Sequence, residues 1–458
     1  MNRTGHPRRG GMTRLGAAAG VAALSLAAAA CAGAGGSSGG SQHTIHVLMV
    51  NNPQMVDLEH MTSQYFTKQT GIKVDFTVLP ENDLRDKASQ EFSSQAGQYD
   101  VATLSNFEIP FYSKNGWLVP LNSFLAKDPG FGQGDILKPI AQSLTGADGK
   151  IYGEPFYGES SFLMYRTDVF AAKHLTMPAH PTWQQVATLA SEVNGAQPGM
   201  RGICLRGQPG WGEVWAPLTT VVNTFGGTWF DKSWNAQATA APFRNAVNFY
   251  VNLVRQYGEP GASQSGFTEC LNNFGQGKTA MWYDATSAAG SLEAAGSPVA
   301  GKVGFVPAPV VSTSSSGWLY SWAWAMEKAG KNQQDAWKFI SWASGKQYVQ
   351  LDGQHSGWAG IPPGTRTSTY SNPQYLKVAS AFAQPTLTAI NSTNPSSPGV
   401  QPRPTPGIQF VDIPEFTDFG MATSQLISQA IAGQASVSSA LSQTQNLAQT
   451  AGNKYKGH

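Results

Sequence analysis

From Thr44 onward the chain alternates strand and helix patterns, and this alternation constrains its fold more than any other feature. Hydrophobic periodicity predicts strands at 44–50, 72–79 and 99–104, with helices between them at 57–70 and 83–95. A strand–helix–strand–helix–strand order predicts a parallel sheet with helices on both faces. The expected fold class is therefore α/β.

The predicted strands end in polar residues. In open α/β sheets, ligands bind beyond the carboxyl ends of the strands. Glu81 follows the second strand, and Asn106 and Glu108 follow the third. We expect these side chains to face a ligand, although residues in such positions also cap helices. Arg85, on the predicted helix 83–95, is a further candidate contact, but a position on the solvated face of that helix explains the residue equally well.

A second group of predicted elements starts near Tyr157. Strands are expected at 162–165, 202–206 and 280–283, and helices at 182–193, 215–225 and 243–257. The patterns at 303–307, 321–326 and 333–344 resemble the first group resuming. The Pro-rich residues 391–407 are predicted to form a surface loop, because the helical segment 420–450 is too short to be a separate domain.

The first 30 residues have the pattern of a secretory signal peptide: a basic start followed by a short apolar stretch at 15–30. Cys31 follows three alanines and resembles the lipidated cysteine of a bacterial lipoprotein, with a flexible Gly/Ser-rich tether at 31–43. The alternative is an ordinary signal peptide with an incidental Cys31. We expect an extracytoplasmic protein that a lipid on Cys31 anchors to the outer face of the cell membrane.

Two further cysteines, Cys204 and Cys270, occur in the chain. In an oxidising compartment, a lone pair of cysteines usually forms a disulfide. Two separately buried thiols are the alternative. A metal site is not expected, because no other Cys or His lies at ligand spacing from either residue.

Charge and composition exclude several classes of function. The chain has 30 Lys+Arg against 28 Asp+Glu, and acidic residues are in slight excess once the basic leader is left out. No nucleic-acid partner is expected, because such a protein needs an excess of positive charge. Charged residues make up only 13% of the chain, and this low share together with the 13 tryptophans favours a neutral ligand.

The sequence contains no motif for a nucleotide, a metal or another cofactor, and none is expected. Paired carboxylates for glycoside hydrolysis could occur among Glu108, Glu159, Glu213 and Asp284, but nothing in the sequence selects two of them. We therefore do not expect an enzyme, and a secreted carbohydrate-active enzyme is the alternative from another class.

Several motifs together resemble a known class of proteins. Residues 274–278 (FGQGK), 280–284 (AMWYD) and 303–309 (VGFVPAP) resemble the extracellular solute-binding proteins of ABC importers, the class that includes maltose-binding protein. Further segments are similar to the sorbitol/mannitol (polyol) branch of this class: 206–213 (RGQPGWGE), 223–230 (NTFGGTWF), 257–262 (YGEPGA), 357–366 (GWAGIPPGTR) and 407–416 (GIQFVDIPEF). The similarity extends from about Thr44 to Tyr455.

The resemblance implies a periplasmic-binding-protein-like fold, with a ligand cleft between two α/β lobes. Three hinge crossings are expected near 157–159, 284–286 and 327–330. One lobe would comprise 44–158 plus 285–328, and the other 159–284 plus 329–458.

The resemblance also implies a function. A lipid-anchored substrate-binding protein, expected to be a monomer, would pass a polyol or small sugar to ABC permease subunits in the membrane. A receptor for disaccharides or oligosaccharides is the alternative on the same scaffold.

Ligand contacts are implied at the hinge crossings. Asp284 ends an apolar strand where this class places a ligand contact; the alternative is a cap on Ser287. Glu159 lies in the first crossing, where relatives often have a ligand-binding acid, and a solvated hinge residue is the alternative. Tyr157, two residues earlier, is a further candidate.

Tryptophan and arginine side chains complete the candidates. Trp211 lies in a Gly-rich turn and is expected to form a wall of the cleft. Trp318 and Trp322 follow a Ser/Gly-rich loop and could close over a ligand. Trp358 and Arg366 come from the polyol-like motif; Arg366 could donate to hydroxyl groups or brace a loop through an ion pair.

Overall fold

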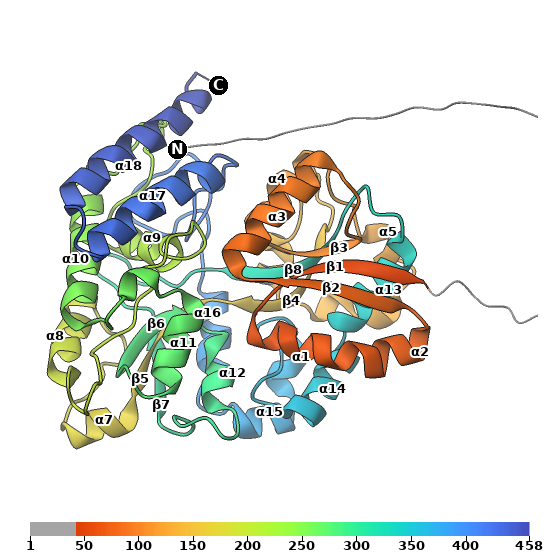
Figure 1. The fold of residues 1–458 in the computed structure, drawn as a ribbon, viewed down its shortest axis with the longest axis horizontal. Helices are drawn as coiled ribbons and strands as arrows, with labels where there is room; N and C mark the ends of the chain where they lie inside the picture. Colours follow the sequence, from red (N-terminus) through yellow and green to blue (C-terminus); the bar gives the residue numbers. More distant parts are fainter. Residues whose placement is uncertain (1–42, 458) are drawn as a thin grey trace, which may run out of the picture. The chain divides into compact units, whose positions relative to one another are not determined.

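Two β-sheets organise residues 43–457, the part of the chain that the computed structural model describes (Figure 1). The larger sheet contains β1 (Thr44–Val50), β2 (Lys73–Leu79), β3 (Val101–Ser105), β4 (Gly153–Glu159) and β8 (Tyr320–Met326). Their order across the sheet is β2-β1-β3-β8-β4. Strand β1 pairs in parallel with β2 and β3, as predicted, whereas β8 runs antiparallel to β3 and β4.

The smaller sheet contains β5 (Ser161–Arg166), β6 (Met281–Ala285) and β7 (Val303–Pro307). Their order is β6-β5-β7, and both pairs are antiparallel. The strand predicted at 202–206 is wrong: within this segment only Cys204 forms a β-bridge, to Trp282, and the preceding Arg201 forms a second one to Thr279. Glycine and proline at 207–210 follow directly and favour a turn over a longer ladder.

Helices cover both faces of the larger sheet, and Figure 1 shows α3 and α4 on one side with α1 and α2 on the other. The helices around this sheet are α1 (Pro53–Met61), α2 (Lys68–Thr70), α3 (Glu81–Ser94), α4 (Glu108–Lys114), α5 (Asn122–Leu125), α6 (Lys138–Ser143), α13 (Gln333–Ala343) and α14 (Lys346–Asp352). A π-helical turn joins α1 to α2, and the run ends at Gly71, whose φ of 73° is left-handed. This helical run starts earlier than the predicted residue 57, because Pro53 suits the first turn of a helix.

The remaining helices are α7 (Thr167–Ala172), α8 (Trp183–Val193), α9 (Trp215–Thr224), α10 (Ala241–Tyr257), α11 (Phe267–Gly275), α12 (Ala288–Glu293), α15 (Pro373–Val378), α16 (Ala383–Asn391), α17 (Phe416–Ile431) and α18 (Val437–Gly452). The segment predicted as helical at 420–450 forms the packed pair α17 and α18. Residues 392–415 contain no helix or strand, in keeping with the predicted surface loop, although Ile408–Val411 are buried.

The chain passes from the larger to the smaller sheet at Ser160, between β4 and β5, close to the first expected crossing. The next crossing differs from the prediction at 284–286. Strand β7 pairs with β5, so the chain returns to the larger sheet only through residues 308–319.

The predicted crossing at 327–330 is wrong as well. Helix α13 follows β8 and stays with the larger sheet, where Phe339 packs against Phe66 and Phe76. The expected lobe boundaries therefore misplace both β7 and α13. A short apolar strand can complete either sheet, so only its pairing partner decides where it belongs.

No helix within residues 43–457 has the length and apolar character needed to cross a membrane. The predicted signal peptide, Cys31 and most of the tether lie outside the described residues.

Candidate ligand-binding site

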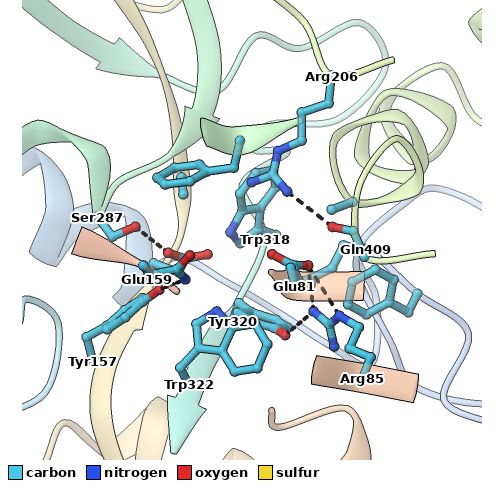
Figure 2. Close-up of a pocket in the computed structure, with 16 residues that line it drawn as sticks. Glu81, Arg85, Tyr157, Glu159, Arg206, Ser287, Trp318, Tyr320, Trp322 and Gln409 are labelled. Atoms are coloured by element: carbon cyan, nitrogen blue, oxygen red, sulfur yellow. Dashed lines mark hydrogen bonds and ion pairs between the residues drawn. The ribbon is translucent and has the colours of Figure 1, made fainter. Parts of the chain in front are cut away.

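A cavity lies between segments of the larger sheet and segments that pack with the smaller one (Figure 2). It holds about 370 Å³ of space, including what is open to solvent. The lining consists mainly of polar and aromatic side chains, among them Asn52, Glu81, Arg85, Tyr157, Glu159, Arg206, Phe267, Ser287, Trp318, Tyr320, Trp322, Gln409 and Phe410.

Arg85 of α3 organises one wall. Its Nη2 donates to Glu81 Oε1 at 2.8 Å and to the Tyr320 hydroxyl at 2.6 Å. Its guanidinium lies over the Trp211 ring, 3.9 Å from the ring centroid. Burial opposes the positive charge, but Tyr320 and Glu81 outweigh it and hold the pKa of Arg85 above its ordinary value. Arg85 is therefore a buried, charged group rather than part of a solvated helix face.

Arg206 organises a second wall. Its Nε and Nη2 donate to the two carboxylate oxygens of Asp284 at 2.9 and 2.6 Å. Its Nη1 donates to the Gly212 carbonyl at 3.1 Å and to Glu213 Oε2 at 3.3 Å. Burial opposes this charge too, but Asp284 and Glu213 raise the pKa of Arg206 well above its ordinary value. The cavity is thus lined by two arginines whose positions are fixed by acidic partners.

Two polar residues of β4 face the cavity. Asn52 Nδ2 donates to the Tyr157 hydroxyl at 2.6 Å, and the Ser287 hydroxyl donates to Glu159 Oε2 at 2.5 Å. Burial raises the pKa of Glu159 to about 7, against the opposing effects of Ser287 and Arg206. Near neutral pH, Glu159 can therefore offer a ligand either a carboxyl proton or a carboxylate oxygen.

Trp318 contributes a hydrogen-bond donor that is not in use. The residue lines the cavity and is 1% exposed, and its Nε1 has no hydrogen-bond partner among the described residues. An unsatisfied buried donor costs about 1–3 kcal/mol. A ligand oxygen in the cavity would remove this cost.

The charges around the cavity favour a neutral ligand. Arg85 is paired with Glu81, and Arg206 is paired with Asp284 and Glu213. Because each arginine is already offset by a carboxylate, the walls present no excess positive charge to attract an anion. A ligand with many hydroxyl groups could donate to the acids and accept from Arg and Trp.

The structure brings together five residues that the sequence predicts as ligand contacts: Glu81, Tyr157, Glu159, Trp318 and Trp322. It places three others behind the arginines. Trp211 packs on the Arg85 guanidinium, and Glu108 Oε1 accepts from Arg85 Nη1 at 3.5 Å. Asp284 lies behind Arg206 and is 0% exposed.

The remaining three predicted residues lie elsewhere. Asn106 lines a neighbouring cavity, where its Oδ1 accepts from the Ser321 amide at 3.0 Å. Trp358 packs against a separate apolar cluster that includes Tyr375. Arg366 is buried, donates to the Ser344 carbonyl at 3.0 Å and pairs with Asp135, which agrees with the loop-bracing alternative.

Sequence reasoning missed Arg206, Tyr320, Phe267, Gln409 and Phe410. Arg206, Gln409 and Phe410 belong to the polyol-like motifs, but residue type alone gave no reason to choose them within those motifs. Tyr320 lies just before the predicted strand 321–326 and is the first residue of β8, and nothing in the sequence marks it as a ligand contact. Phe267 carries no signal in the sequence, because only the packing of α11 brings it near Arg206, whose guanidinium carbon lies 5.3 Å from its ring centroid.

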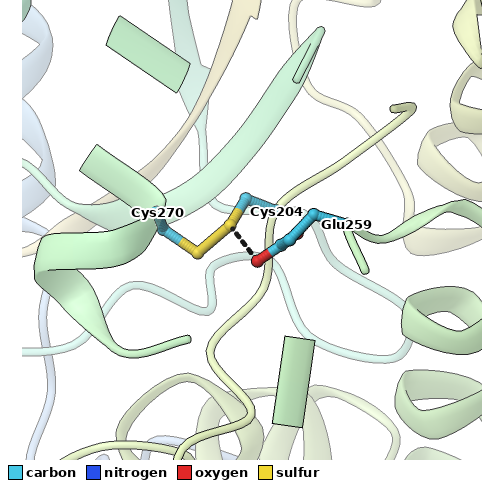
Figure 3. Close-up of side chains that lie close together, drawn as sticks. All are labelled: Cys204, Glu259 and Cys270. Atoms are coloured by element: carbon cyan, nitrogen blue, oxygen red, sulfur yellow. Dashed lines mark hydrogen bonds between the residues drawn. A yellow bond between two sulfur atoms is a disulfide. The ribbon is translucent and has the colours of Figure 1, made fainter. Parts of the chain in front are cut away.

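Cys204 and Cys270 form a disulfide with a Cα–Cα distance of 5.7 Å (Figure 3). Glu259 Oε1 lies 3.0 Å from Cys204 Sγ. Burial raises the pKa of Glu259 above its ordinary value. These three residues are close enough to hold a metal ion, but the disulfide leaves no thiolate to act as a ligand.

The family described as bacterial extracellular solute-binding protein matches residues 52–350. A mannitol-binding protein of Pseudomonas aeruginosa is 38% identical over 405 residues, which cover 88% of this chain and 91% of that protein.

Solved structures show the same relationship. An ABC transporter solute-binding protein of Agrobacterium vitis S4, crystallised with D-mannitol, superposes with a TM-score of 0.87 at 42% identity, covering 90% of this chain and 99% of that one. Maltose-bound MalE3 of T. maritima superposes with a TM-score of 0.74 at 19% identity, covering 89% and 99%. The last likeness concerns the fold alone, and together the two confirm the predicted fold class.

Proposed function

Because the chain belongs to the family of bacterial extracellular solute-binding proteins, we propose that it captures an acyclic polyol of about the size of mannitol outside the cell and delivers it to the permease of an ABC importer. The observation that carries the proposal is the cavity between the two sheets. It is lined by two arginines that are each paired with carboxylates, by further acids and by the unused Trp318 donor. A mannitol-binding protein and a mannitol-bound receptor among the relatives support it.

The chemistry of the walls suits an open chain of hydroxyl groups. Each hydroxyl donates once and accepts up to twice. Glu81 and Glu159 supply acceptors, whereas Arg206 and Trp318 supply donors. Leaving a buried group unpaired costs about 1–3 kcal/mol, so the fixed pattern of donors and acceptors would select among sugars and sugar alcohols.

A thermal-shift screen tests this function. The panel comprises mannitol, sorbitol, ribitol, glucose and maltose. A ligand that binds only the folded state stabilises it by about 2.7 kcal/mol at 100 times its Kd. We expect an alditol to give the largest shift. A shift for maltose alone would favour a disaccharide receptor. In a separate turnover assay on glycosides, release of sugar would indicate an enzyme.

The two sheets are proposed to form the cores of two lobes that close on the ligand. Cavity residues come from both sides, for example Arg85 of α3 and Arg206, which lies near the smaller sheet. A ligand that contacts both lobes stabilises the closed arrangement. Small-angle scattering with saturating ligand should give a smaller radius of gyration, and an unchanged radius with proven binding would contradict closure.

The lipid anchor and the monomeric state also remain proposals. The sequence around Cys31 supports lipidation, and the tether would hold the receptor near its permease. Cys31→Ala should release the protein into the medium, so membrane retention of that variant would overturn the anchor. Sedimentation should give the mass of one chain.

A further inference from the structure

A larger cavity adjoins the candidate ligand site and shares the wall residues Gln409 and Phe410 with it. It holds about 1000 Å³ of space, including what is open to solvent, compared with about 370 Å³ for the ligand site. Its lining includes Gln142 and Thr145. The Gln142 amide can hydrogen-bond to a sugar, and the Thr145 hydroxyl, which donates to the Ala141 carbonyl at 2.9 Å, can accept a further hydrogen bond. The ligand site and a second space with hydrogen-bonding groups therefore meet at a wall that includes Gln409 and Phe410.

The ring of Phe410 is firmly packed in this wall. Phe410 is 5% exposed, and its ring centroid lies 5.3 Å from that of Phe107, 5.1 Å from that of Trp211 and 6.2 Å from that of Tyr320. Beside it, Gln409 Nε2 donates to the Leu319 carbonyl at 3.1 Å. Edge-to-face aromatic contacts of this kind hold a ring in one position.

The backbone that carries the wall is also fixed, although it belongs to the long loop 392–415. Asn223 Nδ2 donates to the Ile408 carbonyl at 2.7 Å. Arg403 bridges the Gly407 carbonyl and Asn223 Oδ1, at 3.1 Å each. Gly407 has a φ of 128°, and a Cβ there would collide with the Phe410 carbonyl. Only glycine can bring the backbone at position 407 this close to the Phe410 carbonyl, so the loop holds Gln409 and Phe410 in a defined place.

We propose that Phe410, supported by Gln409, sets the upper limit on ligand length, and that the adjoining cavity is a latent subsite for a second sugar unit. The inference rests on the proposed function and concerns the same ligand. With the ring in place, the ligand site ends at the wall that includes Gln409 and Phe410. Removing the ring would join the two spaces, so that a hexitol carrying a glucosyl group could place its alditol part in the ligand site and its sugar ring beyond the wall.

Calorimetric titration with sorbitol and with its glucosylated form, maltitol, tests the inference. Wild-type protein should bind sorbitol at least about a hundredfold more tightly than maltitol. Phe410→Ala should reduce this preference at least about tenfold, through tighter binding of maltitol. Ser143→Ala is the control, because Ser143 lines only the adjoining cavity and its substitution leaves the aromatic contacts of Phe410 in place.

Each of three results would overturn this inference without touching the proposed function. They are an unchanged preference in a folded Phe410→Ala protein, an equal change in Ser143→Ala, and tight maltitol binding by the wild type. If Phe410→Ala fails to fold by circular dichroism, Phe410→Leu is judged by the same criterion. A wild-type protein that binds no alditol at all would instead overturn the proposed function, and this inference with it.

Discussion

Asp284 holds the Arg206 side chain through two hydrogen bonds, of 2.9 Å to Nε and 2.6 Å to Nη2. The Trp282 indole and the Ala285 amide also donate to this carboxylate. Its oxygens are therefore occupied, and the residue does not line the cavity. Asp284 is a positioning residue that would act on a ligand through Arg206, in contrast to the direct contact implied by sequence resemblance.

The first prediction concerns this pair. Asp284→Asn keeps the shape but removes the charge that holds Arg206, so we expect about tenfold weaker binding of the best alditol and a loss of about 1–3 kcal/mol in the free energy of unfolding. Asp168→Asn is the matched control, because Asp168 accepts from Arg166 Nε and Nη2 at 2.8 and 2.6 Å outside the cavity. Wild-type affinity in Asp284→Asn, measured by calorimetry, would contradict this role.

The second prediction concerns the unused donor of Trp318. Trp318→Phe removes the Nε1 donor, so it should weaken alditol binding about five- to tenfold while leaving the free protein equally or more stable. Trp324 is a close control, because its buried Nε1 also lacks a partner among residues 43–457 but does not line the cavity. Trp324→Phe should therefore leave affinity unchanged. Equal effects of the two variants would show that Trp318 makes no ligand hydrogen bond.

The third prediction is that the titration of Glu159 makes the stability of the folded protein depend on pH. Burial raises the pKa of Glu159 to about 7 from an ordinary 4.5, so the folded state holds this proton more tightly than the unfolded state. Stability from this group is fully present below pH 4.5 and is lost as the pH rises through about 7. The loss is roughly 2–4 kcal/mol, at about 1.4 kcal/mol for each tenfold change in proton affinity.

Urea unfolding at pH 4.5 and pH 8 measures this contribution. The free energy of unfolding should fall less between the two pH values in Glu159→Gln than in the wild type, because the variant lacks the titrating group. Glu192→Gln, on the exposed face of α8, should behave like the wild type. A Glu159→Gln protein with the pH profile of the wild type would refute the assignment.

The fourth prediction concerns the disulfide. Cys204 lies two residues before Arg206, and Cys270 lies on α11, the helix that begins with Phe267 of the cavity wall. Closing the 66-residue separation stabilises by about 4 kcal/mol on the chain-entropy model. Mass spectrometry of the unreduced, exported protein should find the two residues joined, and reduction should lower both stability and alditol affinity. Two free thiols would contradict the pairing.

The sequence predicted strands β1, β2, β3 and β8 of the larger sheet, because hydrophobic periodicity is a local signal, but it did not predict β4 (Gly153–Glu159). Strands β1 and β3 and helix α3 lie within a few residues of their predicted bounds. It did not predict the partner of β7, since pairing with β5 depends on contacts far apart in the chain. The expected crossings at 284–286 and 327–330 failed for this reason.

The candidate site shows the same limit. Residues that follow strands or lie in the first crossing, such as Glu81 and Glu159, could be found from position and residue type. Position and residue type do not distinguish a residue that would contact the ligand directly from one that would act on it only through another side chain. Asp284 and Glu108 have the right chemistry, but only the fold shows that Arg206 and Arg85 stand in front of them.

The most direct test of the account is a calorimetric titration of the mature wild-type protein with D-mannitol, together with sorbitol, ribitol and maltose. We predict saturable binding of one alditol per chain and no measurable heat of binding for maltose, because the wall proposed at Phe410 would exclude a second sugar unit. Saturable binding of maltose with no response to any alditol would contradict both the ligand class and the shape assigned to the site.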